Sequence, residues 1–262
     1  MKQLMLGNAA AARGLFEGGC EFVSSYPGTP STEITEEAAK FKEIYCEWAP
    51  NEKVALESAF GACLAGRRAF CGMKHVGLNV AADPLYTMSY TGVNAGLVIG
   101  VADDPGMHSS QNEQDSRYHA IASKIPMIEP SDSDEAREFA KLAFEISEKF
   151  DTPVLFRMTT RVAHTKETVE IGERVEVVEK PFEKNPRKYV MVPANAYKKH
   201  IDLEEKLLKM QEFSDNLEEN FIEIKDKKLG IVTDSVSYMY VIEVYPNASV
   251  LKLSMPFPLP DK

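Results

Sequence analysis

One carboxylate at the start of a helical run is the residue best suited to chemistry in this sequence. Glu52 follows the apolar segment Ile44–Trp48, which is typical of a buried strand, and opens the run NEKVALESAFGACLAGRRAF. Small residues recur along this predicted helix, at Ala55, Ala59, Ala62 and Ala65. A carboxylate on such a strand-to-helix turn can point into a domain or subunit interface. The alternative is structural, because a glutamate in a first helical turn complements the helix dipole.

A stiff loop places a threonine at the end of another predicted strand. The segment YPGTPSTEI follows the strand predicted over Glu21–Ser25. Its two prolines restrict the backbone, and Gly28 permits a positive φ. Thr29, held between them, suits a ligand-binding loop. A rigid turn with no ligand is the alternative interpretation.

The segment KHVGLN follows the strand predicted over Ala69–Lys74 and brings two more candidates to the same edge. His75 can face a ligand or be a satisfied buried histidine, and the structural interpretation is favoured. Gly77 can permit close approach of a ring or simply start the next helix.

A long polar segment, DDPGMHSSQNEQDSRY, follows the strand predicted over Leu97–Val101. Loops of this length in compact domains are often functional. The guanidinium of Arg117 suits a carboxylate ligand, because its fork of N–H groups matches two oxygens. The alternative is an ion pair with Asp115 or Glu113. After the strand predicted over Pro153–Arg157, the segment RMTTRVAH could bind anions or anchor a following domain by salt bridges.

The order of elements explains why these segments should meet. Short apolar strands alternate with helices through about residue 157, which predicts a parallel six-stranded sheet with helices on both faces. Ligands bind at the carboxyl ends of such strands. The predicted strands are Glu21–Ser25, Ile44–Trp48, Ala69–Lys74, Leu97–Val101, Pro126–Glu129 and Pro153–Arg157. The predicted helices are Gly7–Glu17, Ser31–Phe41, Glu52–Arg67, Val80–Ser89 and Ser133–Lys149, the last capped by Asp132 or Ser133.

The regular alternation of apolar strands and helices ends after residue 165. Residues 166–226 are charged, with an extended segment over Val169–Val178 and a helix over Pro193–Leu217. Residues 227–262 then begin a second α/β domain, with a buried strand, a helix and another strand predicted over Leu229–Thr233, Ser235–Val244 and Ser249–Leu253. Two strands are a poor independent unit. We therefore expect a truncated piece of a larger polypeptide or a fold completed by a partner.

Composition narrows the class of protein. The 262 residues are 44% hydrophobic and 27% charged, with a net charge of -10, which disfavours nucleic acid as a partner. The four cysteines form no CxxC pair, so the chain has no signature of a zinc or iron–sulfur site, and no metal ligands are predicted. Reduced cysteines fit the cytoplasm. No apolar run approaches the roughly 18 residues of a membrane span.

Together these motifs resemble the 2-oxoacid:ferredoxin oxidoreductases. The pattern around Glu52 resembles the pyrimidine-binding domain of thiamine diphosphate enzymes, assigned here to residues 1–165. The stretches GNAAAARGLFEGGCEFVSSYPGTPSTEI and DDPGMHSSQNEQDSRYHA look like the amino-terminal part of alpha subunits of the indolepyruvate branch. The resemblance implies oxidative decarboxylation of indolepyruvate or other aryl pyruvates to aryl-acetyl-CoA, with electrons passed to ferredoxin.

The resemblance also implies roles for individual residues. Glu52 would bond N1′ of the aminopyrimidine and activate the cofactor, while Thr29 and Arg117 would hold the substrate. The residues expected to line the cofactor, besides Glu52, are Pro27, Gly28, His75 and Gly77.

Part of the expected enzyme is missing from these residues. No Gly-Asp-Gly…Asn pattern occurs, so another domain would hold the diphosphate and Mg²⁺. The resemblance implies [4Fe-4S] clusters elsewhere in the full enzyme, coenzyme A as cosubstrate, a beta subunit and ferredoxin as partners, and an oligomer. The chain alone is then expected to be inactive. Two alternatives are a subunit of a non-oxidative thiamine-dependent decarboxylase and a non-catalytic scaffold domain.

Overall fold

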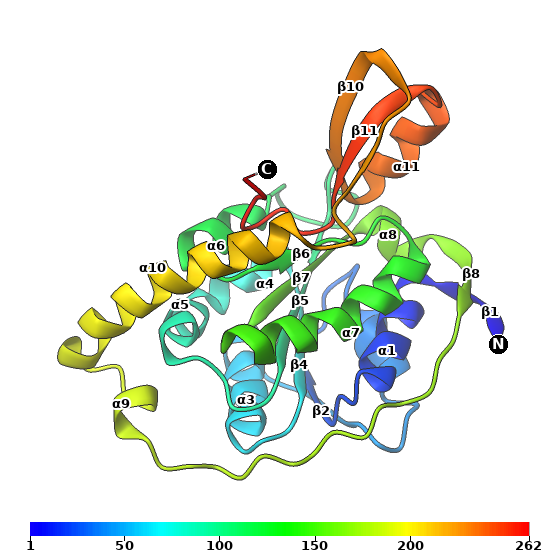
Figure 1. Cartoon of the computed structure of the whole chain (residues 1–262). Helices are drawn as coiled ribbons and strands as arrows, with labels where there is room; N and C mark the ends of the chain where they lie inside the picture. The colour runs from blue at the N-terminus through cyan, green and yellow to red at the C-terminus, as the bar shows by residue number, and fades with distance from the viewer. Residues whose placement is uncertain (262) are drawn as a thin grey trace.

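A six-stranded parallel sheet forms the centre of the molecule in the computed structural model, which describes residues 1–261 (Figure 1). The strand order is β3-β2-β4-β5-β7-β6, and every pairing is parallel. This confirms the predicted fold class. The strands are β2 (Phe22–Ser25), β3 (Tyr45–Trp48), β4 (Ala69–Lys74), β5 (Leu97–Asp103), β6 (Met127–Ile128) and β7 (Val154–Thr159).

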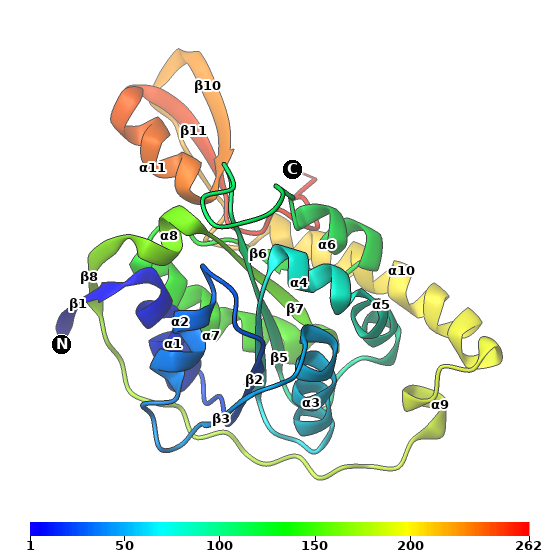
Figure 2. The same cartoon turned by 180° about the vertical axis from the view of Figure 1, so that it is seen from behind.

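Helices cover both faces of this sheet (Figures 1 and 2). Alternate side chains of β4 explain this arrangement, because Phe70 packs into one core cluster while Cys71 packs into the other. The first cluster includes residues of α1 (Gly7–Glu17), α2 (Thr32–Ala38), α7 (Ser133–Phe150) and α8 (Thr160–His164). The second includes residues of α3 (Glu52–Leu64), α4 (His75–Val80), α5 (Ala82–Thr91) and α6 (Arg117–Ser123).

Side-chain caps fix the starts of two of these helices. The Asn51 side chain accepts a hydrogen bond of 3.0 Å from the backbone N–H of Val54, at the start of α3. The Asp132 side chain accepts one of 2.8 Å from Glu135 N at the start of α7, as the sequence predicts. Both caps satisfy N–H groups that have no partner inside the helix.

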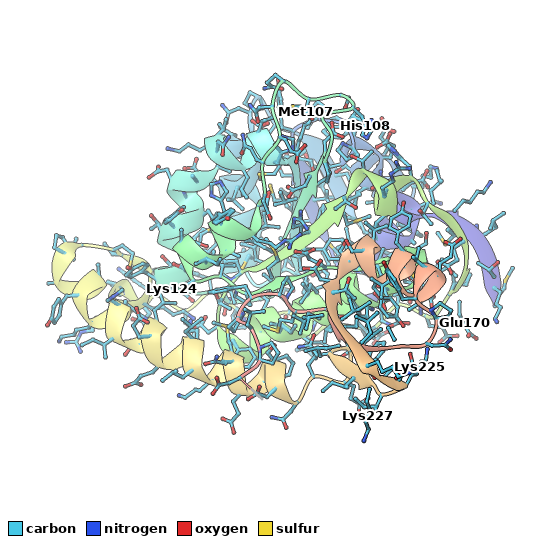
Figure 3. All side chains as sticks on the ribbon, turned by 90° about the horizontal axis from the view of Figure 1, so that it is seen from above. Met107, His108, Lys124, Glu170, Lys225 and Lys227 are labelled. Carbon is cyan, nitrogen blue, oxygen red and sulfur yellow. The ribbon has the colours of Figure 1, made fainter. Side chains whose placement is uncertain are left out.

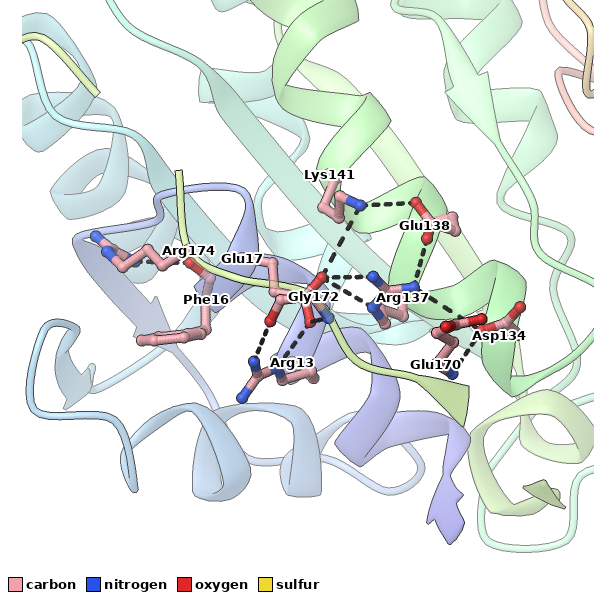
Figure 4. Close-up of polar contacts among 10 residues, drawn as sticks. All are labelled: Arg13, Phe16, Glu17, Asp134, Arg137, Glu138, Lys141, Glu170, Gly172 and Arg174. Carbon is pink, nitrogen blue, oxygen red and sulfur yellow. Dashed lines mark hydrogen bonds and ion pairs between the residues drawn. The ribbon is translucent and has the colours of Figure 1, made fainter. Parts of the chain in front are cut away.

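The sequence analysis missed the first strand. β1 (Lys2–Leu6) pairs antiparallel with β8 (Lys166–Glu170), so the extended segment predicted over Val169–Val178 is a strand only at its start. The chain after β8 is held by Glu17, which is fully buried and accepts a 2.7 Å hydrogen bond from Gly172 N (Figure 4). Arg137 of α7 donates to the same carboxylate at 2.8 Å. This buried pair ties α1, α7 and the segment after β8 together.

The chain then crosses to a long helix on the other side of the molecule. α9 (Pro186–Tyr189) precedes α10 (Pro193–Asp215), which confirms the predicted helix apart from its last two residues. α10 lies beside α5, where the Tyr90 hydroxyl is 3.0 Å from His200 Nδ1.

The last part of the chain forms a small second sheet. Its order is β10 (Asp226–Asp234), β11 (Ala248–Leu253), β9 (Phe221–Glu223), and α11 (Ser235–Val244) packs against it. The strand predicted over Leu229–Thr233 is confirmed as part of β10, but its predicted burial is wrong, because most of β10 is exposed and Val232 is 66% exposed. An apolar run indicates burial only where a neighbouring element covers it. The sequence also missed β9, which is a strand only through its pairing with β11.

This second sheet is joined to the edge of the first. Met127 N donates to Phe257 O at 2.8 Å, and Glu129 N donates to Ser254 O at 2.8 Å. Lys252 is fully buried and forms an ion pair with Glu135 at the start of α7. Backbone and charge contacts therefore connect the two sheets, while the domain limits proposed at residues 165 and 226 stay predictions.

Candidate active site

Glu52 and Gly77 meet at the carboxyl ends of β3 and β4. Glu52 is the first residue of α3 and is half-buried. A methyl group at residue 77 would lie 2.4 Å from Glu52 Oε1 and 2.6 Å from its Cγ. Gly77 is therefore needed where it stands, because any larger residue would displace the carboxylate. The structure brings these two predicted site residues into contact.

The Glu52 carboxylate has neither a hydrogen bond nor an ion pair within residues 1–261. Its neighbours Asn51 and Lys53 are both engaged, with Val54 N and Asp83 respectively. The oxygens of such a carboxylate accept no hydrogen bond from the protein, so they are available to accept one from a ligand.

Hydrogen bonds fix the backbone around Thr29. Gly28 N donates to Thr32 Oγ1 at 2.9 Å, and Ser31 Oγ donates to Gly28 O at 2.8 Å. Gly28 does not adopt the positive φ that a glycine permits. Gly28 instead allows close packing, since a methyl group there would lie 3.1 Å from Lys74 Cβ. Thr29 and Pro27 are exposed at the tip of this fixed loop.

His75 holds the long polar loop after β5. The imidazole is fully buried, and its Nε2 lies 3.1 Å from the carbonyl oxygen of Asn112, to which it must donate. Nδ1 is buried without a hydrogen-bond partner in the described part of the chain. Lys74 Nζ donates to Ser109 O at 2.7 Å and anchors the same loop. The imidazole is therefore satisfied at Nε2 only, and a contact of His75 with a ligand stays a prediction.

The loop is also built around an internal carboxylate. Asp104 accepts hydrogen bonds from Ser109 N at 2.8 Å, Ser110 Oγ at 2.6 Å and Thr160 Oγ1 at 2.9 Å. Burial opposes ionisation, but these hydrogen bonds outweigh it and hold the pKa of Asp104 below its usual range. The carboxylate is therefore charged and saturated with donors.

Arg117 lies in a cluster of carboxylates. Its guanidinium is one-third exposed and forms three ion pairs, at 3.1 Å with Glu129, 3.0 Å with Asp234 and 3.3 Å with Asp115. The pairing with Asp115 is one of the alternatives that the sequence left open. The structure does not bring Arg117 into contact with Glu52 or Thr29 in residues 1–261.

A second, buried ion-pair network is centred on Arg157, which the sequence analysis named as a possible salt-bridge residue without finding its carboxylate partners. Arg157 Nε donates to Asp103 at 2.7 Å, and its Nη1 donates to Glu129 at 2.6 Å. Burial raises the pKa of Glu129 to about 7, although Arg157 and Arg117 oppose the shift. Asp103 and Glu129 each stand at or just after the end of a strand, and this position was the only signal in the sequence.

Burial suppresses the ionisation of three cysteine thiols. Burial raises the pKa of Cys20 to about 12, and those of Cys46 and Cys63 to about 11, so these thiols are not activated. No group of three or more histidine, cysteine, aspartate or glutamate side chains in the described residues could hold a metal ion. No helix in residues 1–261 is both long and apolar enough to cross a membrane.

Comparison with known proteins identifies the class. Residues 13–227 match the family described as pyruvate flavodoxin/ferredoxin oxidoreductase, thiamine diP-binding, and the chain belongs to this family. The fold is similar to that of a 2-oxoglutarate:ferredoxin oxidoreductase from Magnetococcus marinus, with a TM-score of 0.78 and 17% identity. That similarity covers 99% of this chain and 55% of the other.

Within this family, the chain is similar to subunits that share one name. It is 44% identical to the indolepyruvate oxidoreductase subunit IorA of Archaeoglobus fulgidus, over 100% of this chain and 44% of that protein. It is 47% identical to the subunit of the same name from Pyrococcus abyssi, over 98% of this chain and 42% of that protein. The chain spans less than half the length of these relatives, and the matches confirm the resemblance read from its motifs.

Proposed function

We propose that this chain is the pyrimidine-binding part of a thiamine-diphosphate-dependent indolepyruvate:ferredoxin oxidoreductase. The observation that carries the proposal is the unengaged Glu52 carboxylate, seated against Gly77 at the carboxyl edge of the sheet. The similarity to two subunits named indolepyruvate oxidoreductase supports the choice of substrate. The whole enzyme would oxidatively decarboxylate an aryl pyruvate, form an acyl-coenzyme A product and pass electrons to ferredoxin.

The residues present fit one end of thiamine diphosphate. Glu52 offers an acceptor for a ring nitrogen, and the absence of a side chain at Gly77 leaves room for the carboxylate beside it. Pro27 and Gly28 present the loop that carries Thr29 at the same edge. When bound, the cofactor supplies the stabilisation of negative charge on carbon that amino-acid side chains lack. The contribution of Glu52 is to hold the proton at the ring nitrogen.

Other parts of the enzyme must lie outside this chain. No group of side chains in residues 1–261 suits Mg²⁺, so the diphosphate and its metal would be held by another domain. Iron–sulfur clusters, a beta subunit and ferredoxin would complete the electron path. The proposal therefore requires an assembly, in which this chain supplies Glu52 and the substrate loop.

Thr29 and Arg117 are proposed to hold the substrate. Thr29 has an exposed hydroxyl on a fixed backbone, which suits a hydrogen bond to a 2-oxoacid. Arg117 would bind the substrate carboxylate only by exchanging one of its ion pairs with Glu129, Asp234 or Asp115. The cost of this exchange is small where the partner is exposed, because a solvent-exposed ion pair contributes about 0–1 kcal/mol.

Replacing Glu52 by Gln in the complete enzyme tests the proposal. Indolepyruvate-dependent reduction of a viologen dye, measured with coenzyme A and thiamine diphosphate, is expected to fall at least about 100-fold, because the amide cannot hold the ring proton as a carboxylate does. Glu57→Gln, in the exposed part of the same helix, is the matched control and should keep its activity. Parental turnover in Glu52→Gln would refute the assignment.

The same assay separates the alternative functions. Carbon dioxide release that needs neither coenzyme A nor an electron acceptor would indicate a non-oxidative decarboxylase. No turnover on any 2-oxoacid by the parent enzyme, with its clusters and partner present, would indicate a scaffold.

A further inference from the structure

A basic hollow lies where the long polar loop after β5 meets α8, after the end of β7. Its volume is about 330 Å³, and its lining consists of side chains that carry or can carry positive charge together with two hydroxyls: His108, Thr160, Arg161, His164 and Thr165. His108 belongs to the long polar loop after β5, which Figure 3 shows from above. The other four residues belong to α8 and the residue after it.

Arg161 distinguishes this hollow from the rest of the sheet edge. Arg157 and Arg117 are neutralised by carboxylates, as described above. Within residues 1–261, the guanidinium of Arg161 forms neither an ion pair nor a hydrogen bond. The Arg161 side chain is exposed. The chain as a whole has a net charge of -10. An unneutralised guanidinium in a hollow of an acidic protein attracts an anion locally.

The carboxylates near the hollow leave this charge uncancelled. Asp104 is only 1% exposed and already accepts three hydrogen bonds, one of them from Thr160. Glu33 lies 4.0 Å from His164 Nε2, at the limit of an ion pair. Thr160 donates its proton to Asp104, and Thr165 donates its proton to the Arg161 carbonyl, so both hydroxyls keep only acceptor capacity. The donors that remain for a ligand are Arg161 and the two imidazoles.

We propose that this hollow binds a phosphate or carboxylate group of a small molecule. Arg161 holds two of its oxygens through the paired N–H groups of the guanidinium, and the imidazoles of His108 and His164 supply further donors. The site is separate from Glu52 and Thr29, and it goes beyond the proposed function because none of its residues contacts them. Its position at the carboxyl ends of parallel strands is the usual place for ligands in this architecture.

Equilibrium dialysis of the chain with radiolabelled inorganic phosphate tests the proposal. Arg161→Gln is expected to weaken phosphate binding about 10- to 100-fold, which is the usual effect of losing a charge-assisted hydrogen bond from an anion. Lys209→Gln is the matched control, because it removes the same unit of charge from an exposed position on α10 that does not line this hollow. The control is expected to bind phosphate as the parent does.

Each outcome of the dialysis experiment either supports or overturns the proposed anion site. Circular dichroism melts should show that both variants fold, since Arg161 and Lys209 are both exposed. If acetate displaces phosphate, the site also accepts carboxylates. If acetate leaves phosphate binding unchanged, the site selects phosphate. Both results support the proposed site. No phosphate binding by the parent chain, or equal binding by the parent and Arg161→Gln, overturns it. The result is independent of turnover, so it stands or falls apart from the oxidoreductase assignment.

Discussion

Replacing Gly77 by Ala would test the geometry around Glu52 with one methyl group. The new carbon would lie 2.4 Å from Glu52 Oε1, 2.6 Å from Cγ and 2.8 Å from Cδ. Ordinary contacts between such atoms begin near 3.4 Å. The carboxylate must therefore move by about 1 Å, and a displacement of that size at a reacting group reduces turnover about 100-fold.

Stability should respond in a different way from activity. The methyl group meets a half-buried, flexible side chain, so Glu52 can move without unpacking the core. Alanine is favoured over glycine inside a helix by about 1 kcal/mol, which offsets part of the cost. We expect the melting temperature of Gly77→Ala to stay within a few degrees of the parent, while dye reduction by the complete enzyme falls about 100-fold.

Gly61→Ala is the matched control, since this helical glycine has open space where the methyl group would lie. It should retain full turnover and gain up to about 1 kcal/mol of stability. Parental turnover in Gly77→Ala, at indolepyruvate concentrations above and below KM, would show that catalysis does not depend on the position of the Glu52 carboxylate. The reasoning from the structure would then be refuted.

Two further predictions concern buried charge. The pKa of Glu129 is raised from 4.5 to about 7 by burial, so the folded chain keeps a proton that the unfolded chain releases between these values. The contribution of Glu129 to the unfolding free energy therefore falls as pH rises from about 4.5 to 7. Glu129→Gln should flatten this dependence on pH when unfolding free energies are measured by urea titration. An unchanged dependence of the unfolding free energy on pH would contradict the raised pKa. Glu17→Ala leaves Arg137 buried without its main partner and should cost about 3–5 kcal/mol, whereas the exposed control Glu57→Ala should change stability by less than about 0.5 kcal/mol. Equal urea midpoints for these two variants would show that the buried pair contributes nothing.

The sequence by itself determined the sheet and the edge at which the site lies. β4 was predicted over Ala69–Lys74 and occupies the same residues, because a strand buried on both faces is apolar throughout its length. Parallel strands joined by helices place all their carboxyl ends together, so the segments after Ser25, Lys74 and Asp103 had to lie at the same edge. These features depend on local periodicity and on connection rules that one sequence already contains.

Only the tertiary structure decided which side chains touch. The sequence left open whether Gly77 permits close approach of a ring or starts a helix, and only the structure shows that it makes room for Glu52, 25 positions earlier in the chain. Arg117 pairs with Asp234, which lies 117 positions away in the second sheet, and no local pattern could have indicated that partner. The exposure of Val232 depends likewise on which elements cover β10. Such contacts depend on how distant segments pack and on their register, whereas periodicity reports only which face of an element is buried.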